Sequence, residues 1–368
     1  MILMNDFQRE PPELRNAMLT AAQRVIESGW YVLGTEVATF EERWAAVCGV
    51  GYGVGVGNGM DAIEIALRAM DIGPGDEVIT TPMTAFASVL GILRSGATPV
   101  LADIEPNTAL LSQDSAARCI STKTKAVLLV HLYGQVRAMA SWQEFCTTKG
   151  ISLIEDCAQA HLATWQGKVA GSFGVAGAYS FYPTKNLGAP GDAGMLVTNN
   201  LAISERAGRI RNYGQSVRYH HPELGMNSRL DEIQAAMLTT RMKWLPEFTE
   251  RRREIAQAYR EGINSPLVTQ LAPPEEPSAH AYHLYVVSCP LRDDLQTHLK
   301  EHQVQALIHY PIPVQAQAPC MHIKRDPLGL TISEAHAAQC LSLPCHPQMS
   351  DEDVKKVINA VNGFNSIL

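Results

Sequence analysis

The run YSFYPTKNLGAPGD, residues 179–192, has the residue types and spacing most suggestive of chemistry. An apolar segment leads into it and delivers Ser180 and then Lys185 to a loop rich in glycine and proline. Most lysines are solvated surface charges, and Lys185 taken alone would be interpreted that way. A lysine held in a dry pocket, however, has a lowered pKa and can form a Schiff base with an aldehyde.

A carboxylate and an amide follow the short apolar run of residues 151–154. Asp156 lies at the end of this predicted strand and would need a partner if buried, because an isolated buried carboxylate is costly. A protonated heterocyclic nitrogen is one such partner, and Gln159 could reach the same ligand by a side-chain hydrogen bond. For Asp156 considered alone, a helix-capping role is the simpler interpretation.

Glycines at alternate positions, from Gly49 to Gly59, lead into a predicted helix. The backbone of such a loop can approach an anion, and a helix N-terminus offers free N–H groups and a positive dipole end. Tight packing explains the glycines equally well. A dinucleotide site would require an acid at the end of the next strand, but Glu77 precedes that strand, which ends in Thr-Thr-Pro. We therefore favour a phosphate group over a nicotinamide cofactor.

Together these features match what pyridoxal phosphate requires of a protein, namely a lysine for its aldehyde, an acid for its ring nitrogen and a cup for its phosphate. Each feature has a more common explanation by itself. Their joint occurrence at predicted strand ends outweighs those explanations. The sequence therefore predicts pyridoxal phosphate as cofactor, with Lys185 and Asp156 as the catalytic residues.

Short β-rich runs alternate with amphipathic helical stretches between residues 53 and 200. Near-continuous apolar runs such as AVLLV indicate strands covered by helices on both faces, and repeated strand–helix units predict a mostly parallel sheet. In such sheets the carboxyl ends of the strands carry the chemistry. The expected strands are residues 78–81, 99–103, 126–131, 151–155, 176–181 and 195–198.

The pattern changes near residue 245, which predicts a large domain over residues 1–245 and a smaller α+β domain over residues 246–368. A helix over residues 228–244 is expected to end near Pro246. The other expected elements are helices over 250–262 and 291–301, strands over 282–288 and 304–308, and helices that begin at Ser333 and Ser350.

Composition limits the class of protein. The 368 residues are 46% hydrophobic and 18% charged, with a formal net charge of −7, which argues against general electrostatic binding to nucleic acid. No apolar stretch is long enough to cross a membrane, and the first residues lack the apolar core of a signal peptide. The eight cysteines have no metal-site spacing. We expect a cytoplasmic protein without metal, disulfide, nucleic-acid or membrane partners.

A series of motifs occurs in order along the chain: GNGMDAIEIAL, GPGDEVITTPMTAFAS, GATPVLADI, KTKAVLLVHLYG, IEDCAQAH, FYPTKNLGAPGDAG and GMNSRLDEIQAA. Over roughly residues 25–245 the chain resembles the DegT/StrS-type nucleotide-sugar aminotransferases. The runs HLYGQ, RNYGQ, LIHYPIP and LSLPCHPQM look most like the dTDP-3-keto-6-deoxyhexose 3-aminotransferases. The resemblance implies an α/β fold with an aspartate-aminotransferase-like (fold type I) large domain, a smaller C-terminal α+β domain and a homodimer with shared active sites.

The resemblance also implies roles around the cofactor ring. Lys185 stands where the family forms its internal aldimine. Asp156 stands where a carboxylate keeps the pyridine nitrogen protonated, and Gln159 where an amide bonds to the ring hydroxyl. Phe86 occupies the aromatic position that stacks on the ring.

Four further positions match the phosphate contacts of the family. Gly59 and Met60 would supply backbone N–H groups, and Ser180 its hydroxyl. Many relatives have Thr or Ser where Met60 stands, so a side-chain contact is missing here. Asn227 would reach the phosphate from the other subunit of the dimer.

The reaction implied is amino transfer from L-glutamate to a dTDP-linked 3-keto-6-deoxyhexose, with His309 and Tyr310 near the sugar. The product would be a dTDP-3-amino-3,6-dideoxyhexose for a surface glycan, such as the O-antigen of lipopolysaccharide, or for a glycoside. A C4 aminotransferase acting on a 4-keto sugar nucleotide is the first alternative. A non-catalytic regulatory or binding protein on the same fold is a remote one, because Lys185 and Asp156 are both present.

Overall fold

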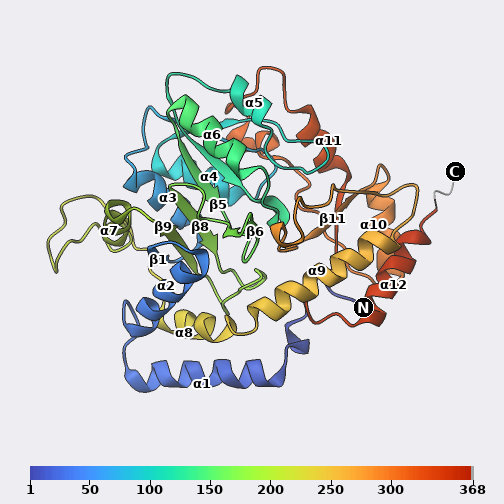
Figure 1. The fold of residues 1–368 in the computed structure, drawn as a ribbon, viewed down its shortest axis with the longest axis horizontal. Helices are drawn as coiled ribbons and strands as arrows, with labels where there is room; N and C mark the ends of the chain where they lie inside the picture. Colours follow the sequence, from blue (N-terminus) through green and yellow to red (C-terminus); the bar gives the residue numbers. More distant parts are fainter. Residues whose placement is uncertain (366–368) are drawn as a thin grey trace.

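The computed structural model describes residues 1–365, which form one large sheet, one small sheet and a two-stranded hairpin, with surrounding helices (Figure 1). The strands of the large sheet lie in the order β1-β9-β8-β5-β4-β2-β3-β12. Neighbours from β8 to β12 run parallel, whereas β9, beside the edge strand β1, is antiparallel to both of its neighbours, β8 and β1. Their bounds are β1 Tyr52–Val56, β2 Glu77–Thr80, β3 Thr98–Leu101, β4 Thr124–Val130, β5 Ser152–Asp156, β8 Ala176–Ser180, β9 Gly194–Thr198 and β12 Lys324–Arg325.

Helices cover both faces of this sheet. They are α1 Pro12–Ser28, α2 Thr35–Cys48, α3 Gly59–Ala69, α4 Phe86–Ser95, α5 Gln113–Arg118, α6 Met139–Lys149, α7 Leu201–Ile210 and α8 Glu232–Arg241. In β4, Val127 and Leu129 belong to the core under α2, α6 and α8, while Ala126 and Leu128 belong to the core under α3, α4 and α7. Successive side chains of a strand point to opposite faces of the sheet. Because β4 has a core on each face, all of these positions must be apolar, which explains the continuous apolar run seen in the sequence.

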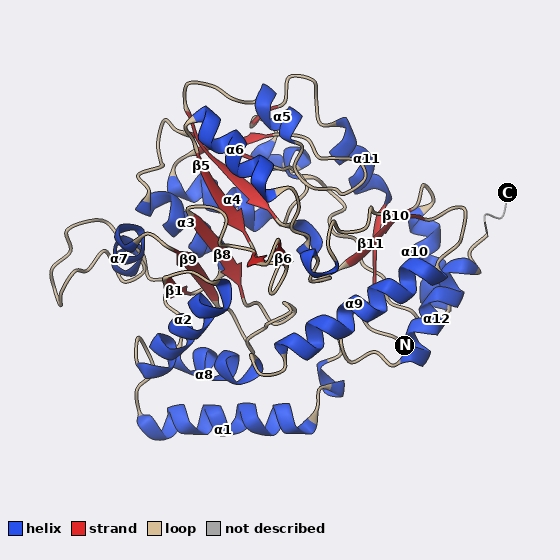
Figure 2. Cartoon of the chain, in the orientation of Figure 1, coloured by secondary structure: helices blue, strands red, loops and turns tan. Residues whose placement is uncertain are grey.

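The small sheet is antiparallel and has its own core (Figure 2). Its strands are β10 Thr269–Gln270, β11 Tyr285–Ser288 and β13 Cys340–Leu343, packed with α9 Leu245–Gly262, α10 Arg292–Glu301 and α12 Asp351–Asn362. The remaining elements are α11 Thr331–Gln339 and the hairpin of β6 Thr164–Trp165 and β7 Lys168–Val169.

Each strand predicted between residues 53 and 200 is present, with ends shifted by two residues at most. The glycine run is only partly a loop, because Gly53 and Gly55 lie within β1. A side chain at Gly53 would bring its Cβ to 2.7 Å from the carbonyl oxygen of Glu41, and one at Gly55 would bring it to 3.0 Å from Leu230. Close packing therefore explains these two glycines, and only Gly59 opens a helix.

Three predictions in the C-terminal part are wrong in detail. Pro246 lies in the first turn of α9, where the missing N–H costs no hydrogen bond, so it begins that helix and does not end α8. The strand expected over residues 282–288 begins at Tyr285. The strand expected over residues 304–308 is replaced by isolated bridges, from Val304 to Ile2 and from Leu307 to Ser342.

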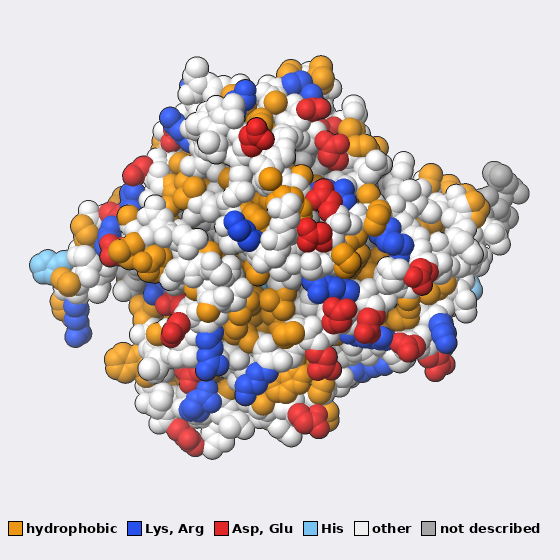
Figure 3. Space-filling view, in the orientation of Figure 1, with side chains coloured by type: hydrophobic (Ala, Val, Ile, Leu, Met, Phe, Trp, Pro, Cys, Tyr) orange, Lys and Arg blue, Asp and Glu red, His pale blue; other side chains and the backbone are white. Residues whose placement is uncertain are grey.

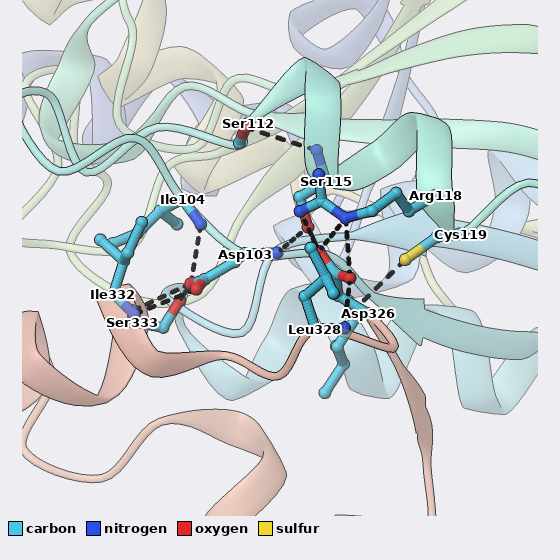
Figure 4. Close-up of polar contacts among 11 residues, drawn as sticks. Asp103, Ile104, Ser112, Ser115, Arg118, Cys119, Asp326, Leu328, Ile332 and Ser333 are labelled. Atoms are coloured by element: carbon cyan, nitrogen blue, oxygen red, sulfur yellow. Dashed lines mark hydrogen bonds and ion pairs between the residues drawn. The ribbon is translucent and has the colours of Figure 1, made fainter.

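A segment near residue 325 returns to the large sheet, where β12 pairs with β3. Asp326 follows β12 and accepts hydrogen bonds from the guanidinium of Arg118 and the hydroxyl of Ser115, both on α5 (Figure 4). The predicted domain boundary between residues 245 and 246 stays a prediction. The residues around β12 belong to the predicted C-terminal domain, but they are joined to the large sheet.

Asp103, which follows β3, supports the same segment from the other side (Figure 4). Its carboxylate accepts hydrogen bonds from the backbone N–H groups of Ile332 at 3.0 Å and Ser333 at 2.9 Å, in the first turn of α11. These N–H groups have no partner within their own helix, so a carboxylate there is stabilising. Asp103 is a strand-end acid with a structural role.

The visible face in Figure 3 carries acidic and basic side chains interspersed, with hydrophobic side chains exposed between them. Among residues 1–365, no helix combines the length and apolar character needed to cross a membrane.

Candidate active site

Two predicted site residues lie at the ends of neighbouring strands. Asp156 ends β5 and Ser180 ends β8, and these strands pair in parallel with Asp156 opposite Ala178. Parallel strands bring their carboxyl ends to the same edge of the sheet. The structure therefore places the predicted ring-binding acid and the predicted phosphate-binding hydroxyl at one edge.

The Asp156 carboxylate is buried, with 6% of the residue exposed. Its Oδ2 accepts a hydrogen bond from the Ser88 hydroxyl at 2.6 Å, and its Oδ1 accepts one from the Ala158 N–H at 3.0 Å. Ser88 lies in the first turn of α4, which begins at the partly buried Phe86. The helix that holds the predicted stacking ring thus also contacts the predicted acid.

Gln159 lies beside Asp156, and its hydrogen bonds determine how it can act. Its Oε1 accepts the backbone N–H of Tyr133 at 2.5 Å, and its Nε2 donates to the Tyr310 hydroxyl at 3.2 Å. An amide nitrogen has two protons, so one N–H of Gln159 is left for a ligand. This side chain can donate to a cofactor oxygen, in agreement with its predicted partner, the ring hydroxyl.

His309 and Tyr310 are held at this site by contacts from the turn after β4 and from a strand of the small sheet. The Tyr133 hydroxyl donates to the His309 carbonyl at 2.6 Å, and the His309 Nδ1 lies 2.8 Å from the hydroxyl of Ser342 in β13. Burial raises the pKa of Tyr310 to about 12, and the negative charge of Asp156 adds to the shift. The phenol is therefore a neutral group beside Gln159, and its contact with a sugar stays a prediction.

The residues of the predicted phosphate cup on α3 and β8 lie close together. A side chain at Gly59 would place its Cβ 2.7 Å from the Cβ of Ser180, so only glycine allows this approach. Asn58 caps α3 through the N–H of Asp61, and among the described residues the N–H groups of Gly59 and Met60 have no partner. Free N–H groups at a helix N-terminus beside a hydroxyl suit a phosphate.

Lys185 lies in the loop after β8 and is partly buried. Burial lowers the pKa of Lys185 to about 8, although the negative charge of Asp156 opposes the shift. The adjacent Asn186 anchors the loop by donating to the carbonyl of Ala281 at 2.8 Å. With this pKa a larger fraction of Lys185 is neutral near pH 7 than for an ordinary lysine, and the neutral amine is the form that attacks an aldehyde.

The imidazoles near Lys185 do not add positive charge. The pKa of His161 is lowered to about 3 and that of His309 to about 4. Burial is the main cause of both shifts, and the positive charge of Lys185 contributes to them. Both rings are neutral at physiological pH, so the positive charges that act on His161 come from Lys185, when it is protonated, and from Arg252.

Asn227, a predicted cofactor residue, makes no hydrogen bond with the other predicted site residues among those that the structure describes. It is exposed, and its backbone bridges to Asn212. In residues 1–365 no hydrogen bond connects its side chain to the site, although the neighbouring Ser228 hydroxyl contacts the Gly57 N–H and the Asp61 carboxylate. Its predicted action from a second subunit stays a prediction.

Tyr133, Ser88 and Thr84 support the site, but they were not among the residues predicted from the sequence. Ser88 and Thr84 left a weak signal, as hydroxyl residues in the apolar run around Phe86. Tyr133 left none, because its contacts come from residues far along the chain.

A second buried polar cluster contains His131, Glu155 and Cys157. Each oxygen of Glu155 already accepts two hydrogen bonds, from the Gly171 N–H and His131 on one side and from the Phe173 and Gly174 N–H groups on the other. A carboxylate has about four acceptor sites, so Glu155 is saturated. The cluster braces residues 171–174.

A lysine with a lowered pKa, a buried acid and a phosphate cup at one edge of a mostly parallel sheet define a pyridoxal-phosphate-dependent enzyme. The model of the DegT/DnrJ/EryC1/StrS aminotransferase family matches residues 12–362, and the chain belongs to this family. Pyridoxal phosphate is its cofactor.

Similar proteins agree with this assignment over nearly the whole chain. A relative from Aneurinibacillus thermoaerophilus, dTDP-3-amino-3,6-dideoxy-alpha-D-galactopyranose transaminase, is 43% identical, with 99% of each chain covered. A "Pleiotropic regulatory protein" from Geobacillus stearothermophilus is 38% identical, with 98% of each covered. The crystal structure of DesV from S. venezuelae in complex with a ketimine intermediate has a TM-score of 0.94 at 37% identity, covering 98% of this chain and 97% of that one. These findings confirm the predicted fold type I architecture.

Proposed function

We propose that this aminotransferase moves the amino group of L-glutamate to carbon 3 of a dTDP-linked 3-keto-6-deoxyhexose. The observation that carries the proposal is the arrangement of Lys185, Asp156 and the Gly59–Ser180 cup at one sheet edge. The choice of carbon 3 is supported by the name of the 43% identical relative. The product is a dTDP-3-amino-3,6-dideoxyhexose.

When bound, pyridoxal phosphate supplies an electron sink for the carbanion formed at the substrate carbon. Lys185, with its pKa of about 8, can take the Cα proton of the amino donor as general base and then, as its ammonium form, give that proton up as general acid. Asp156 pairs with the ring nitrogen, and Gln159 donates its free N–H to the ring oxygen. The N–H groups of Gly59 and Met60 with the Ser180 hydroxyl hold the phosphate.

Absorption spectra of the purified protein, before and after addition of L-glutamate, test the first half of this proposal. We expect a yellow band that glutamate bleaches and that a suitable keto sugar nucleotide restores. A colourless protein that gains no band with added pyridoxal phosphate would contradict the proposal.

The position of the new amino group is tested on the product. With dTDP-3-keto-6-deoxyhexose as acceptor, NMR of the isolated sugar nucleotide should show nitrogen on carbon 3. Restoration of the band only by a 4-keto sugar nucleotide would establish the C4 alternative. A protein that binds the cofactor but turns over none of these sugars would favour the regulatory class, to which one relative's name refers.

A homodimer is part of the proposal, because the Asn227 side chain makes no hydrogen bond to the site within residues 1–365 of its own chain. Large apolar side chains are exposed on two segments, with Trp30 64% exposed near the end of α1 and Leu224 88% exposed after α7. The loop after α7 projects away from the body of the molecule (Figure 1). Such surfaces are typical of subunit contacts. A role in surface glycan or glycoside synthesis and a cytoplasmic location also stay predictions.

A further inference from the structure

We propose that Thr84 and Ser88 form an ordered hydrogen-bond chain that positions the Asp156 carboxylate toward the cofactor ring. This inference rests on the proposed function, because it assigns a task to residues behind the acid that pairs with the ring nitrogen. Neither hydroxyl touches the reacting atoms, so both are positioning residues.

The chain is short and buried. The Ser88 hydroxyl lies 2.6 Å from the Asp156 Oδ2, and the Thr84 hydroxyl lies 2.7 Å from the Ser88 hydroxyl. Only 1% of Ser88 and 4% of Thr84 is exposed. Water does not compete for these groups, and a buried polar group without its partner would be costly.

The direction of the protons follows from the chemistry of the groups. An ionised carboxylate only accepts, so the one proton of the Ser88 hydroxyl points at Asp156. The contact between the two hydroxyls must then be a donation from Thr84 to Ser88. In this hydrogen-bond chain every proton points toward Asp156. The chain holds the Oδ2 atom of Asp156 against α4, while the Ala158 N–H holds Oδ1.

Local backbone capping does not account for these hydroxyls. The helix α4 begins without a side-chain cap, and among the described residues the only hydrogen-bond partners of the two hydroxyls are each other and Asp156. Ser95, at the other end of the same helix, shows the contrasting case, because its hydroxyl donates to the Ile92 carbonyl at 2.8 Å.

The two anchors leave acceptor capacity on both carboxylate oxygens for the ring N–H. If the Ser88 hydroxyl is removed, the carboxylate can rotate and becomes a stronger acceptor for the ring proton. The ring nitrogen then holds its proton less firmly and withdraws electrons less well. The expected loss is in kcat, with little change in the binding of the sugar.

The test compares Ser88→Ala with Ser88→Thr, and Thr84→Val with Thr84→Ser, in the cofactor-loaded enzyme. We expect kcat of Ser88→Ala to fall about tenfold to a hundredfold, with a smaller fall in Thr84→Val and unchanged KM for the sugar. Ser88→Thr and Thr84→Ser keep a hydroxyl and should restore most of the rate. Ser95→Ala is the matched control on the same helix and should retain the parent kcat.

A second readout does not depend on turnover. Enzyme loaded with pyridoxal phosphate labelled with ¹⁵N in the ring should show a ¹⁵N chemical shift in Ser88→Ala displaced toward that of the unprotonated ring. Parent kcat and an unchanged shift in Ser88→Ala would overturn the inference. A second result would also overturn it. If Ser88→Ala lowers Tm and kcat, Ser88→Thr does not restore them, and the ¹⁵N chemical shift is unchanged, the effect of Ser88 is on packing alone. If the parent takes up no cofactor, the proposed function fails and this inference falls with it.

Discussion

At the residue scale, Lys185 combines two properties that surface lysines lack. Burial lowers its pKa to about 8, and the loop that carries it is anchored through Asn186. A neutral amine in a fixed place can attack an aldehyde and later act as a base. These properties lead to two predictions.

Replacing Lys185 with alanine should abolish steady-state turnover and covalent attachment of the cofactor, because no other amine occupies this position. Lys168→Ala is the control, since that lysine is exposed on the β6–β7 hairpin. Activity assays and mass spectrometry of the reduced, cofactor-loaded protein measure both effects. Turnover of Lys185→Ala near the parent rate would remove the lysine from the mechanism.

The pKa of Lys185 should also govern cofactor uptake. The neutral fraction of an amine rises as the pH passes upward through its pKa. The apparent rate at which the apoprotein gains the yellow band should therefore increase from pH 6 and level off above a pH of about 8. Stopped-flow absorption across this range is the measurement. A rate that still rises steeply toward pH 10.5, the ordinary lysine value, would show that burial has not lowered the pKa.

At the element scale, the site depends on how closely α3 approaches the end of β8. Gly59 and Ser180 touch where the helix N-terminus meets the strand end, so a methyl group would push the two apart. Such a displacement changes the position of the free N–H groups as well as the packing.

We expect Gly59→Ala to destabilise the protein by about 1–3 kcal/mol and to weaken cofactor binding. Gly208→Ala is the matched control, because Gly208 lies in α7 with nothing within 4 Å of an added Cβ. That change should be neutral or stabilise by up to about 1 kcal/mol. Thermal unfolding and titration with pyridoxal phosphate test both. Equal stability and affinity in the two variants would argue against a tight contact at Gly59.

At the scale of the whole molecule, residues 320–333 join the C-terminal part of the chain to the large sheet. Burial by itself would raise the pKa of Asp326, but hydrogen bonds from Arg118 and Ser115 outweigh it and lower the pKa to about 2. A carboxyl with a lowered folded-state pKa stabilises the fold above its ordinary value of 3.8. That stabilisation is lost as the pH falls toward 2.

Asp326→Asn should therefore cost about 1–2 kcal/mol at pH 7, and the difference from the parent should shrink below a pH of about 4. Denaturant unfolding of both proteins between pH 3 and pH 7 measures this dependence. Glu254→Gln removes an exposed carboxylate beside Arg251 and should change stability little. A difference for Asp326→Asn that is the same at every pH would assign its effect to packing.

The proposed dimer has its own test at this scale. Lys185→Ala and Asn227→Asp should each be inactive, but a mixed dimer has one site with both native residues. An equal mixture allowed to exchange subunits should recover about a quarter of the parent activity. Light scattering establishes the dimer itself. A mixture that stays inactive, although mixed dimers form, would place Asn227 in its own chain's site or in none.

The sequence by itself determined the class of protein, because the signals for it are local. Each signal can be recognised within about a dozen residues: a strand followed by the Lys185 loop, a strand that ends at Asp156, and a helix that begins at Gly59. Near-continuous apolar runs that alternate with amphipathic helical stretches likewise predicted the central strands. The end of α8 and the beginning of α9 were missed because Pro246 is equally suited to the end of one helix and the first turn of the next.

Only the tertiary structure decided which distant residues meet. Ser88 reaches Asp156 across 68 positions of sequence, Tyr133 reaches His309 across 176, and Asp103 caps α11 from 230 positions away. Such contacts depend on the path of the chain through both sheets and leave no periodic pattern behind. For that reason the sequence predicted the groups proposed to do the chemistry, while the residues that hold those groups in place emerged from the fold.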